Sequence, residues 1–223
     1  MRALIHLVPR GGAGGRFASR IAALVAALRE RAAPRGLAVN ALHRLERDAF
    51  GKHTPFRACV EVIAGDGPGE IAELLADLRP QVDDVAHPDA STLLLGSDAV
   101  FIASDRAPVR FQYLMRRNAS FTHETYLEYY RTKHSRFGLE TPGVLGYVQL
   151  HVDIDASRRA AGRVGLGIWG FDSVSELHLA SQEAFLRALA ESGFGTEPIA
   201  DEEVFVDRPN SLDLCSAVDW DSA

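Results

Sequence analysis

The segment YLEYYRTKH at residues 126–134, followed by YVQLH at residues 147–151, is the most informative part of this chain. Aromatic residues recur in the first segment at helical spacing, and they place His134 on the buried stripe of a helix. The second segment alternates a phenol, an amide and an imidazole with aliphatic residues, which is the pattern of a strand with one polar face. Polar, titratable groups that converge on apolar surface are typical of small-molecule sites. We therefore predict a helix followed by a strand in this region, with a binding site near them.

The same periodicities extend through the second half of the chain. Thr122 is a good N-cap, so we expect the aromatic helix to cover residues 123–136. Ser173 is expected to cap a second helix, over residues 174–190. Apolar residues predict strands at residues 109–115, 145–152, 164–171 and 202–206.

The first half shows the same order of strand, helix, strand, strand, helix, strand. Its expected strands are residues 3–8, 37–46, 56–64 and 93–102, and its expected helices are residues 17–33 and a second one opened by Gly67-Pro68-Gly69. Units of this order match the ferredoxin-like βαββαβ motif, in which two helices cover one face of an antiparallel sheet. We therefore predict an α+β fold of two tandem ferredoxin-like units, residues 1–105 and 106–223.

Composition and charge are those of an ordinary globular chain and argue against several partners. The 223 residues are 47% hydrophobic and 24% charged, with a net charge of −6 and both signs mixed along the length. A nucleic-acid surface needs clustered Lys and Arg, and a membrane span needs roughly 20 apolar residues, so we expect neither partner. Cys59 and Cys215 have no CxxC partner, which argues against a metal centre or a disulfide framework. A start too interrupted for a signal peptide favours a cytoplasmic protein.

Three blocks in the second half follow the order of a known family. They are T-x-E-x-Y-x-x-Y-Y-x-x-x-H at residues 122–134, P-G-x-x-x-Y-x-Q-x-H at residues 142–151 and DEEVFVD at residues 201–207. From Pro108 onward the chain thus resembles the EthD family of dimeric α+β-barrel proteins. Relatives with one unit pair the sheets of two chains into a barrel. The resemblance therefore implies that the two halves form this barrel within one chain, with a further homodimer left open.

The resemblance also implies an activity. The proteins of this family resemble small lyases, dehydratases, cyclases, isomerases and cofactor-free oxygenases that act on aromatic or alicyclic molecules. We therefore expect a lyase or isomerase that uses neither cofactor nor metal and binds a small, hydrophobic, oxygenated compound. His134 is the expected acid or base, because a histidine pKa near 6.5 allows either role at neutral pH. Tyr147 and His151 are expected to polarise the substrate oxygen.

Further side chains are expected to shape the pocket around these catalytic groups. Gln149 would orient the substrate. The alternating Gly165 and Gly167 suggest a cavity on the neighbouring strand, although a twist or bulge would give the same pattern, and the aromatic candidates could equally be core packing. The full set of candidate substrate-binding residues is Tyr126, Tyr130, Gln149, Trp169, Phe111 and Tyr113.

Other interpretations of the same residues remain open. His134 could bond a turn carbonyl at its helix end, and the polar face of residues 147–151 could be exposed to water. A haem enzyme with His151 or His178 as the iron ligand would share the tandem architecture, although no motif supports it. A non-catalytic protein that binds a reactive intermediate would present the same pocket, and only kinetics would separate it from an enzyme.

Overall fold

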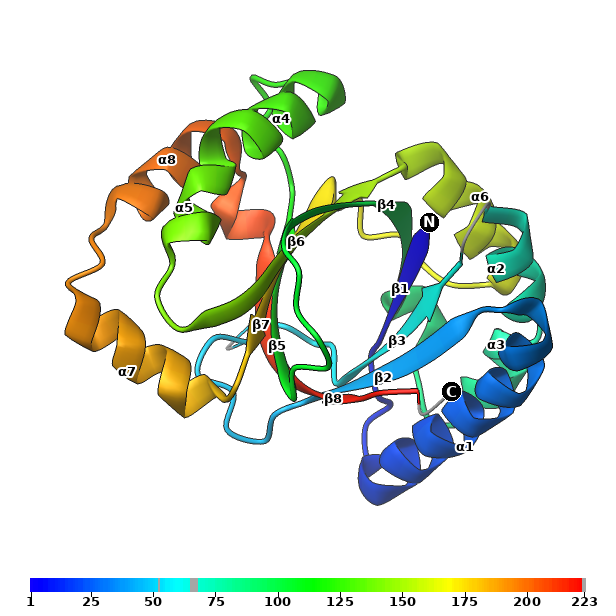
Figure 1. Cartoon of the computed structure of the whole chain (residues 1–223). Coiled ribbons are helices and arrows are strands. Elements are labelled where there is room, and N and C mark those ends of the chain that lie inside the picture. Colours follow the sequence, from blue (N-terminus) through cyan, green and yellow to red (C-terminus); the bar gives the residue numbers. More distant parts are fainter. Residues whose placement is uncertain (52, 65–67, 222–223) are drawn as a thin grey trace.

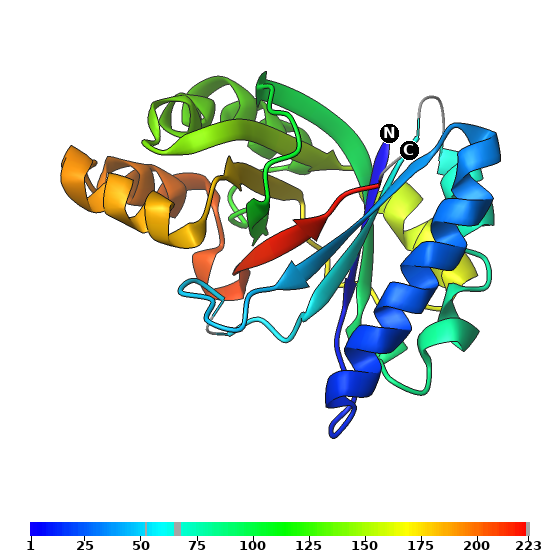
Figure 2. The same cartoon turned by 60° about the horizontal axis from the view of Figure 1, so that its bottom comes forward.

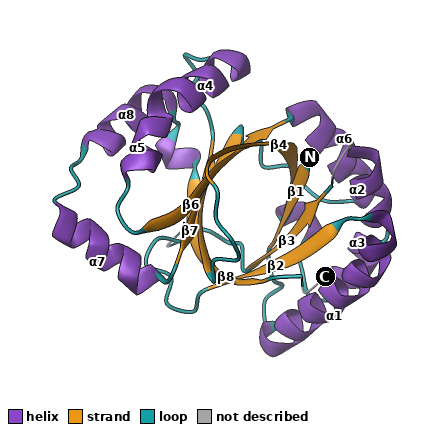
Figure 3. Cartoon of the chain, in the orientation of Figure 1, coloured by secondary structure: helices purple, strands orange, loops and turns teal. Residues whose placement is uncertain are grey.

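A computed structural model describes residues 1–51, 53–64 and 68–221. Within these residues, eight strands close into a barrel in the order β1-β3-β2-β8-β5-β7-β6-β4, and every neighbouring pair is antiparallel. Two layers of helices cover the outside of the barrel on opposite sides (Figures 1 and 2). The separation of an inner ring of strands from outer helices (Figure 3) confirms the predicted mixture of helix and antiparallel sheet.

The first half of the chain supplies four barrel strands and the helices that begin the first layer. Its elements are β1 (Arg2–Leu7), α1 (Gly14–Ala32), β2 (Ala38–Arg44), β3 (Ala58–Ile63), α2 (Pro68–Leu74), α3 (Leu78–Val82) and β4 (Thr92–Ile102). All four expected strands are therefore confirmed. The expected second helix is divided into two short ones, and its expected opening residue Gly67 lies outside the described residues.

The second half supplies the other four strands and five α-helices. Its elements are β5 (Val109–Met115), α4 (His123–Tyr129), a π-helical turn (Tyr130–His134), α5 (Ser135–Glu140), β6 (Val144–Val152), α6 (Ile154–Val164), β7 (Ser173–Leu179), α7 (Gln182–Ser192), α8 (Glu197–Phe205) and β8 (Leu212–Asp219). The aromatic helix and the strands on either side of it are therefore confirmed, with the helix extending to Glu140.

The two halves contribute their strands in the same relative order. The first half forms the run β4-β1-β3-β2, and the second forms the run β8-β5-β7-β6. The runs join where β2 pairs with β8 and where β4 pairs with β6. Gly96 lies at the second join, where a Cβ atom would overlap the carbonyl oxygen of His151. Only a glycine lets the two backbones approach so closely there.

The strand expected at residues 164–171 is wrong. The side chain of Asp153 instead accepts a hydrogen bond from the Ala156 amide and caps helix α6, which Gly165 ends with a φ of 76°. The alternating glycines therefore have two separate causes. Gly165 is a helix C-cap, and at Gly167 a Cβ atom would overlap the carbonyl oxygen of Asp89.

The helix expected at residues 174–190 and the last strand expected at residues 202–206 are also wrong in place. Residues 173–179 form strand β7, and the helix that follows begins only after Ser181, whose side chain accepts a hydrogen bond from the Ala184 amide. Residues 202–205 are the end of helix α8. The last strand is β8, which closes the barrel by pairing with both β2 and β5.

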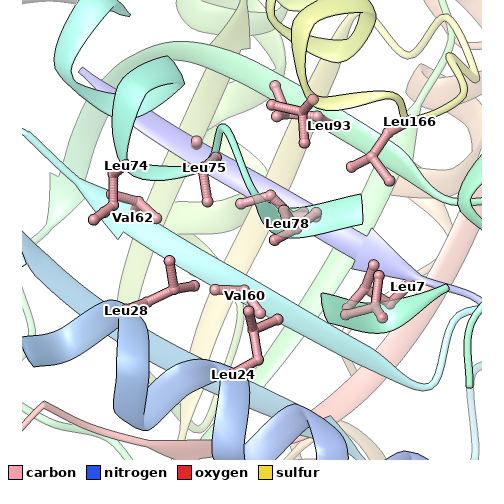
Figure 4. Close-up of a cluster of buried hydrophobic side chains, with 14 of the residues drawn as sticks. Leu7, Leu24, Leu28, Val60, Val62, Leu74, Leu75, Leu78, Leu93 and Leu166 are labelled. Atoms are coloured by element: carbon pink, nitrogen blue, oxygen red, sulfur yellow. The ribbon is translucent and has the colours of Figure 1, made fainter. Parts of the chain in front are cut away.

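Leucine and valine side chains hold the first helical layer on the strands of the first half. Leu24 and Leu28 of α1 lie over Val60 and Val62 of β3, with Leu78 of α3 beside them (Figure 4). Helix α6 belongs to the second half of the sequence, but its buried alanines join this same cluster. The second layer, formed by α4, α5, α7 and α8, lies on the other side of the barrel (Figure 1).

The barrel lumen holds a buried network of charged side chains. Arg2 on β1 and Arg110 on β5 bond Glu61 on β3 at 2.8 Å and 2.6 Å, and both also pair with Glu176 on β7. Strands β1 and β7 are not neighbours, so these side chains meet inside the barrel. Burial opposes the charge on Glu176, but the two arginines outweigh it and lower the pKa of this carboxyl to about 2. The network thus ties the strands of the two halves together.

No helix in the described residues is long and apolar enough to cross a bilayer. The two cysteines, Cys59 and Cys215, are buried and form no disulfide. The described part of the chain holds no group of three or more His, Cys, Asp or Glu side chains with the geometry of a metal site.

Candidate active site

A cavity of about 190 Å³ lies between the outer face of the second half's strands and the helices that cover them. It mixes apolar walls with titratable groups, as small-molecule sites do. The strands β5 to β8 supply Phe111, Tyr113, Met115, Tyr147, Ser175, Leu177 and Asp213; the helices and loops supply His134, Phe137, Gly138, Thr141, Pro198, Glu202 and Arg208.

A π-helical turn presents His134 to this cavity. The helix begins at Thr122, whose side chain accepts a hydrogen bond from the Thr125 amide, and then widens into a π-helix over residues 130–134. Such turns insert one extra residue into a helix and are frequent at functional sites. Tyr126 and Tyr130 remain fully buried on the stripe that the sequence predicted, and His134 follows them at 9% exposure.

Asp201 on α8 holds the His134 ring. Nδ1 of His134 lies 2.7 Å from Oδ2 of Asp201, and the Tyr129 hydroxyl donates to Oδ1 of the same carboxylate at 2.8 Å. Burial lowers the pKa of His134, although the hydrogen bond to Asp201 opposes this shift. The ring is therefore neutral at pH 7 with its proton on Nδ1, where the carboxylate accepts it. Nε2 then carries the lone pair that a general base requires.

The amide of Gln149 fixes the hydrogen-bond direction at Tyr147. Its Nε2 lies 3.2 Å from the carbonyl oxygen of Tyr130, which can only accept, so this atom is the amide nitrogen. The same Nε2 donates to the Tyr147 hydroxyl oxygen at 2.6 Å. The Oε1 atom in turn accepts from Nε2 of His151 at 3.0 Å. Because its oxygen accepts the bond from Gln149, the Tyr147 proton is directed to another acceptor at the cavity, where the hydroxyls of Ser175 and Tyr130 also neighbour it.

The phenol of Tyr147 is tightly packed and keeps its proton. Its ring stacks on Phe101 with centroids 5.1 Å apart, and it passes so close to Gly138 of α5 that a Cβ atom there would overlap the ring. Burial raises the pKa of Tyr147 to about 12. At neutral pH this residue is therefore a hydrogen-bond donor and not a base.

A second acidic group, Glu202, lines the same cavity. It lies on α8 directly after Asp201, and its Oε2 is 3.3 Å from Nε of Arg208. Burial raises the pKa of Glu202 to about 7, with Arg208 opposing and the nearby Asp213 adding to the effect. Consecutive helical residues point in directions about 100° apart, so Asp201 reaches His134 while Glu202 reaches the cavity. Neither was predicted as a site residue, because the sequence predicted a strand at residues 202–206 that begins directly after Asp201.

The second half of the chain, which contains this cavity, is similar to a known protein family. Residues 118–209 match the family model of the EthD domain. The C-terminal half of the chain therefore carries a match to the EthD domain. The EthD match includes His134, Tyr147, Gln149 and Asp201, whereas the cavity residue Tyr113 lies on β5, before the matched region. No curated protein sequence matches the chain.

Solved structures similar to the whole chain share its fold at low identity. A putative monooxygenase from Lactobacillus acidophilus NCFM is 11% identical with a TM-score of 0.54, over 97% of this chain and 92% of that one. A putative chlorite dismutase, TA0507, is 10% identical with a TM-score of 0.56, over 98% and 94%. The chlorite dismutase from Candidatus Nitrospira defluvii in complex with imidazole is 12% identical with a TM-score of 0.55, over 97% and 90%.

The second half of the chain, which carries the EthD match and is called the EthD half below, brings together four of the nine candidate site residues. His134, Tyr147, Phe111 and Tyr113 line the cavity. Three more lie behind it as fully buried supports, with Tyr126 bonded to Ser173 at 2.7 Å and with Tyr130 and Gln149 under the helix.

The last two candidates lie away from the cavity lining. His151 is half-buried beside Leu127 and Arg131 at a surface depression, where it reaches the cavity only through Gln149. Trp169, expected on a strand, lies in the loop after α6, donates to the Ala90 carbonyl at 2.8 Å and packs on Phe56. Its ring therefore has a packing role, and the strand at residues 164–171 that could have placed it at the pocket does not form.

Proposed function

We propose that the EthD half is a cofactor-free lyase or isomerase that moves a proton on a small, oxygenated ring compound. The observation that carries this proposal is the pair of His134 and Asp201, which leaves the basic Nε2 of a neutral imidazole at a cavity that Tyr147 also lines. A base and a hydrogen-bond donor at one enclosed site are the minimum that enolisation requires.

The proposed reaction begins with removal of a proton from a carbon beside a carbonyl group. His134 Nε2 takes the proton, and the electron pair of the C–H bond moves onto the carbonyl oxygen. The O–H group of Tyr147 donates a hydrogen bond to that oxygen as it gains charge. Asp201 stabilises the imidazolium that forms. Return of the proton to another carbon completes an isomerisation, and departure of a leaving group completes an elimination.

The size of the cavity limits the substrate. About 190 Å³ is below the roughly 300–1,000 Å³ that is usual for small-molecule sites. The apolar lining includes the rings of Phe111 and Phe137. These features support a single carbocyclic or aromatic ring that carries one or two oxygen atoms.

The strand order supports a finer proposal about the architecture. Both halves arrange their strands as fourth, first, third, second, which is the order of a ferredoxin-like unit. We propose that residues 1–105 and 106–223 are tandem units of this kind. The two buried thiols are consistent with a reducing compartment such as the cytoplasm.

The residues of this chain do not fit a haem group in the manner considered from the sequence. His178 lies on the lumen side of β7 among charged side chains. His151 on β6 is hydrogen-bonded to Gln149, which separates it from Tyr147. Neither histidine lines the cavity, and a porphyrin needs several times its volume. We therefore derive no step through haem.

Hydrogen exchange on a model ketone tests the proposed function. The purified full chain is incubated with 3-hydroxycyclohexanone in D₂O, and deuterium incorporation at C2 is followed by NMR. We expect catalysed exchange by the wild type and a rate at least about 10²-fold lower for His134→Gln. His87→Gln, which changes an exposed histidine of the first half, is the matched control. Saturable binding of the ketone without exchange would instead support a non-catalytic binding protein.

A further inference from the structure

The cavity contains a buried acid, Glu202, that has no role in the proton transfer proposed above. Glu202 lines the cavity, and its side chain is only 18% exposed. His134, Tyr147 and Glu202 come from three different elements, the π-helical turn, β6 and α8, and they line one cavity. A buried carboxyl group that serves only structure is normally tied by several hydrogen bonds. Glu202 instead has one cationic neighbour inside the cavity, Arg208, at 3.3 Å.

We propose that Glu202 is a second proton-transfer residue of this cavity, and that the chain dehydrates one-ring β-hydroxy ketones. This inference rests on the proposed function, because it needs His134 as the base. A base and a hydrogen-bond donor alone would allow either isomerisation or elimination. A second proton-transfer residue favours the elimination of water.

The elimination balances with the groups present. His134 Nε2 removes the proton from the carbon between the carbonyl and the hydroxyl-bearing carbon, and the enolate forms against Tyr147. The enolate electron pair then returns to form a C=C bond, and the C–O bond to the hydroxyl group breaks. Glu202 gives its proton to the departing hydroxide, which leaves as water. Arg208 holds the resulting carboxylate, and both residues regain their starting states by proton exchange with solvent.

Glu202 suits this role better than the other acids at the cavity. Burial and the neighbouring carboxylates keep a large fraction of Glu202 protonated at neutral pH, since its pKa is about 7. Tyr113 holds its proton far more tightly, because burial raises its pKa well above the usual value. Asp213 lies on β8, where its electrostatic neighbours include Asp48 and Arg44 of the first half. The Arg208 guanidinium neighbours both Glu202 and Tyr113 and can stabilise a negative charge on either, but Glu202 releases its proton far more readily.

The test separates elimination from exchange in the same sample. Full-length wild type, Glu202→Gln and Glu203→Gln are given 3-hydroxycyclohexanone in D₂O, with enone formation followed by its ultraviolet absorbance and C2 exchange followed by NMR. Glu203 is the matched control, because it neighbours Glu202 on α8 and also approaches Arg208, at 3.7 Å, but its side chain is 69% exposed.

We expect Glu202→Gln to lower enone formation by at least about 10²-fold while C2 exchange changes by less than a few fold. Glu203→Gln should behave as the wild type in both assays. Wild-type elimination should also decline as the pH rises through about 7, and exchange should not decline.

Two results would overturn the inference while leaving the proposed function intact. One is wild-type exchange without enone formation, and the other is enone formation that Glu202→Gln leaves unchanged. Absence of wild-type exchange would remove the proposed function and, with it, this inference.

Discussion

At the scale of single residues, the orientation of one amide decides what Tyr147 can do. Gln149 uses both protons of its Nε2 group, one for the Tyr130 carbonyl and one for the Tyr147 oxygen. Its Oε1 is occupied by His151. A carboxylate at this position would accept from Tyr147 and would leave the Tyr130 carbonyl without a donor.

We therefore expect Gln149→Glu to slow exchange on 3-hydroxycyclohexanone by about 10-fold to 10²-fold, because Tyr147 would then donate to the new carboxylate and not to the substrate. The unpaired carbonyl should also lower the free energy of unfolding by about 1–3 kcal/mol. Exchange kinetics and urea unfolding check the two parts.

His151→Gln provides the comparison for that variant, since a glutamine can still donate to Oε1 of Gln149. It should lose less activity than Gln149→Glu. A loss as large as that of His134→Gln would show that His151 acts directly on substrate, as the sequence first suggested.

Residue spacing predicted the strand residues of this site and His134, but it did not predict Asp201 and Glu202. His134, Tyr147 and Gln149 could be predicted because periods of 3.6 and 2 place each on a buried face. Asp201 and Glu202 could not, because the short apolar run at residues 204–206 fits a strand as well as a helix end. A strand would have pointed the two acids to opposite faces, which hides their shared role.

At the scale of elements, the site depends on how closely helix α5 approaches strand β6. Gly138 makes this approach possible, because any side chain there would overlap the Tyr147 ring. The glycine has a helical backbone, so the reason for it is space and not conformation.

Gly138→Ala should therefore lower the free energy of unfolding by about 1–3 kcal/mol and displace Tyr147 from the cavity. Gly162→Ala is the matched control, because a Cβ atom at Gly162 in helix α6 would meet no other atom within 4 Å. That variant should instead gain about 0.5–1 kcal/mol from helix propensity. Urea unfolding of both proteins measures the difference, and a Gly138→Ala protein as stable as Gly162→Ala would refute the packing argument.

The helix wrongly expected at residues 174–190 shows why one element was misplaced. Residues 173–179 carry apolar side chains at positions that fit helical spacing and also alternate, so Ser173 looked like a cap. These residues form a strand and not a helix because β7 pairs with strands on both sides, β5 and β6. Such long-range pairing leaves no local signal, whereas the Asp153 cap of helix α6 was local and readable.

At the scale of the whole molecule, the lumen makes stability depend on pH. His6 on β1 is fully buried, and its Nε2 lies 3.1 Å from Oε1 of Gln112, whose Nε2 donates to Glu176. Oε1 is therefore an acceptor, and His6 carries its proton on Nε2. The other ring nitrogen, Nδ1, has no hydrogen-bond partner in the described structure. Burial lowers the pKa of His6 to about 4, because a second proton would add an unpaired charge.

This lowered pKa sets the sign of the effect on stability. Below pH 6.5 the unfolded chain binds a proton at His6 that the folded chain refuses until about pH 4, so the free energy of unfolding falls as the pH falls through this window. The interval from 6.5 to about 4 corresponds to about 3 kcal/mol. His178, whose pKa burial also lowers to about 4, acts in the same direction. Glu202 acts oppositely between pH 4.5 and about 7, since its raised pKa favours the folded state at the acidic end.

Replacement of His6 measures how much this residue contributes to the pH dependence of the free energy of unfolding. Urea unfolding of the wild type and of His6→Gln at pH 4 and pH 7.5 gives four free energies, in which the contributions of His178 and Glu202 cancel between the two proteins. We expect the wild type to lose about 2–3 kcal/mol more than His6→Gln on acidification. The exposed His87→Gln protein should follow the wild type, which controls for the loss of a histidine as such. An identical loss in wild type and His6→Gln would mean that the lumen admits a proton at His6 without cost, and that the buried network does not resist added charge.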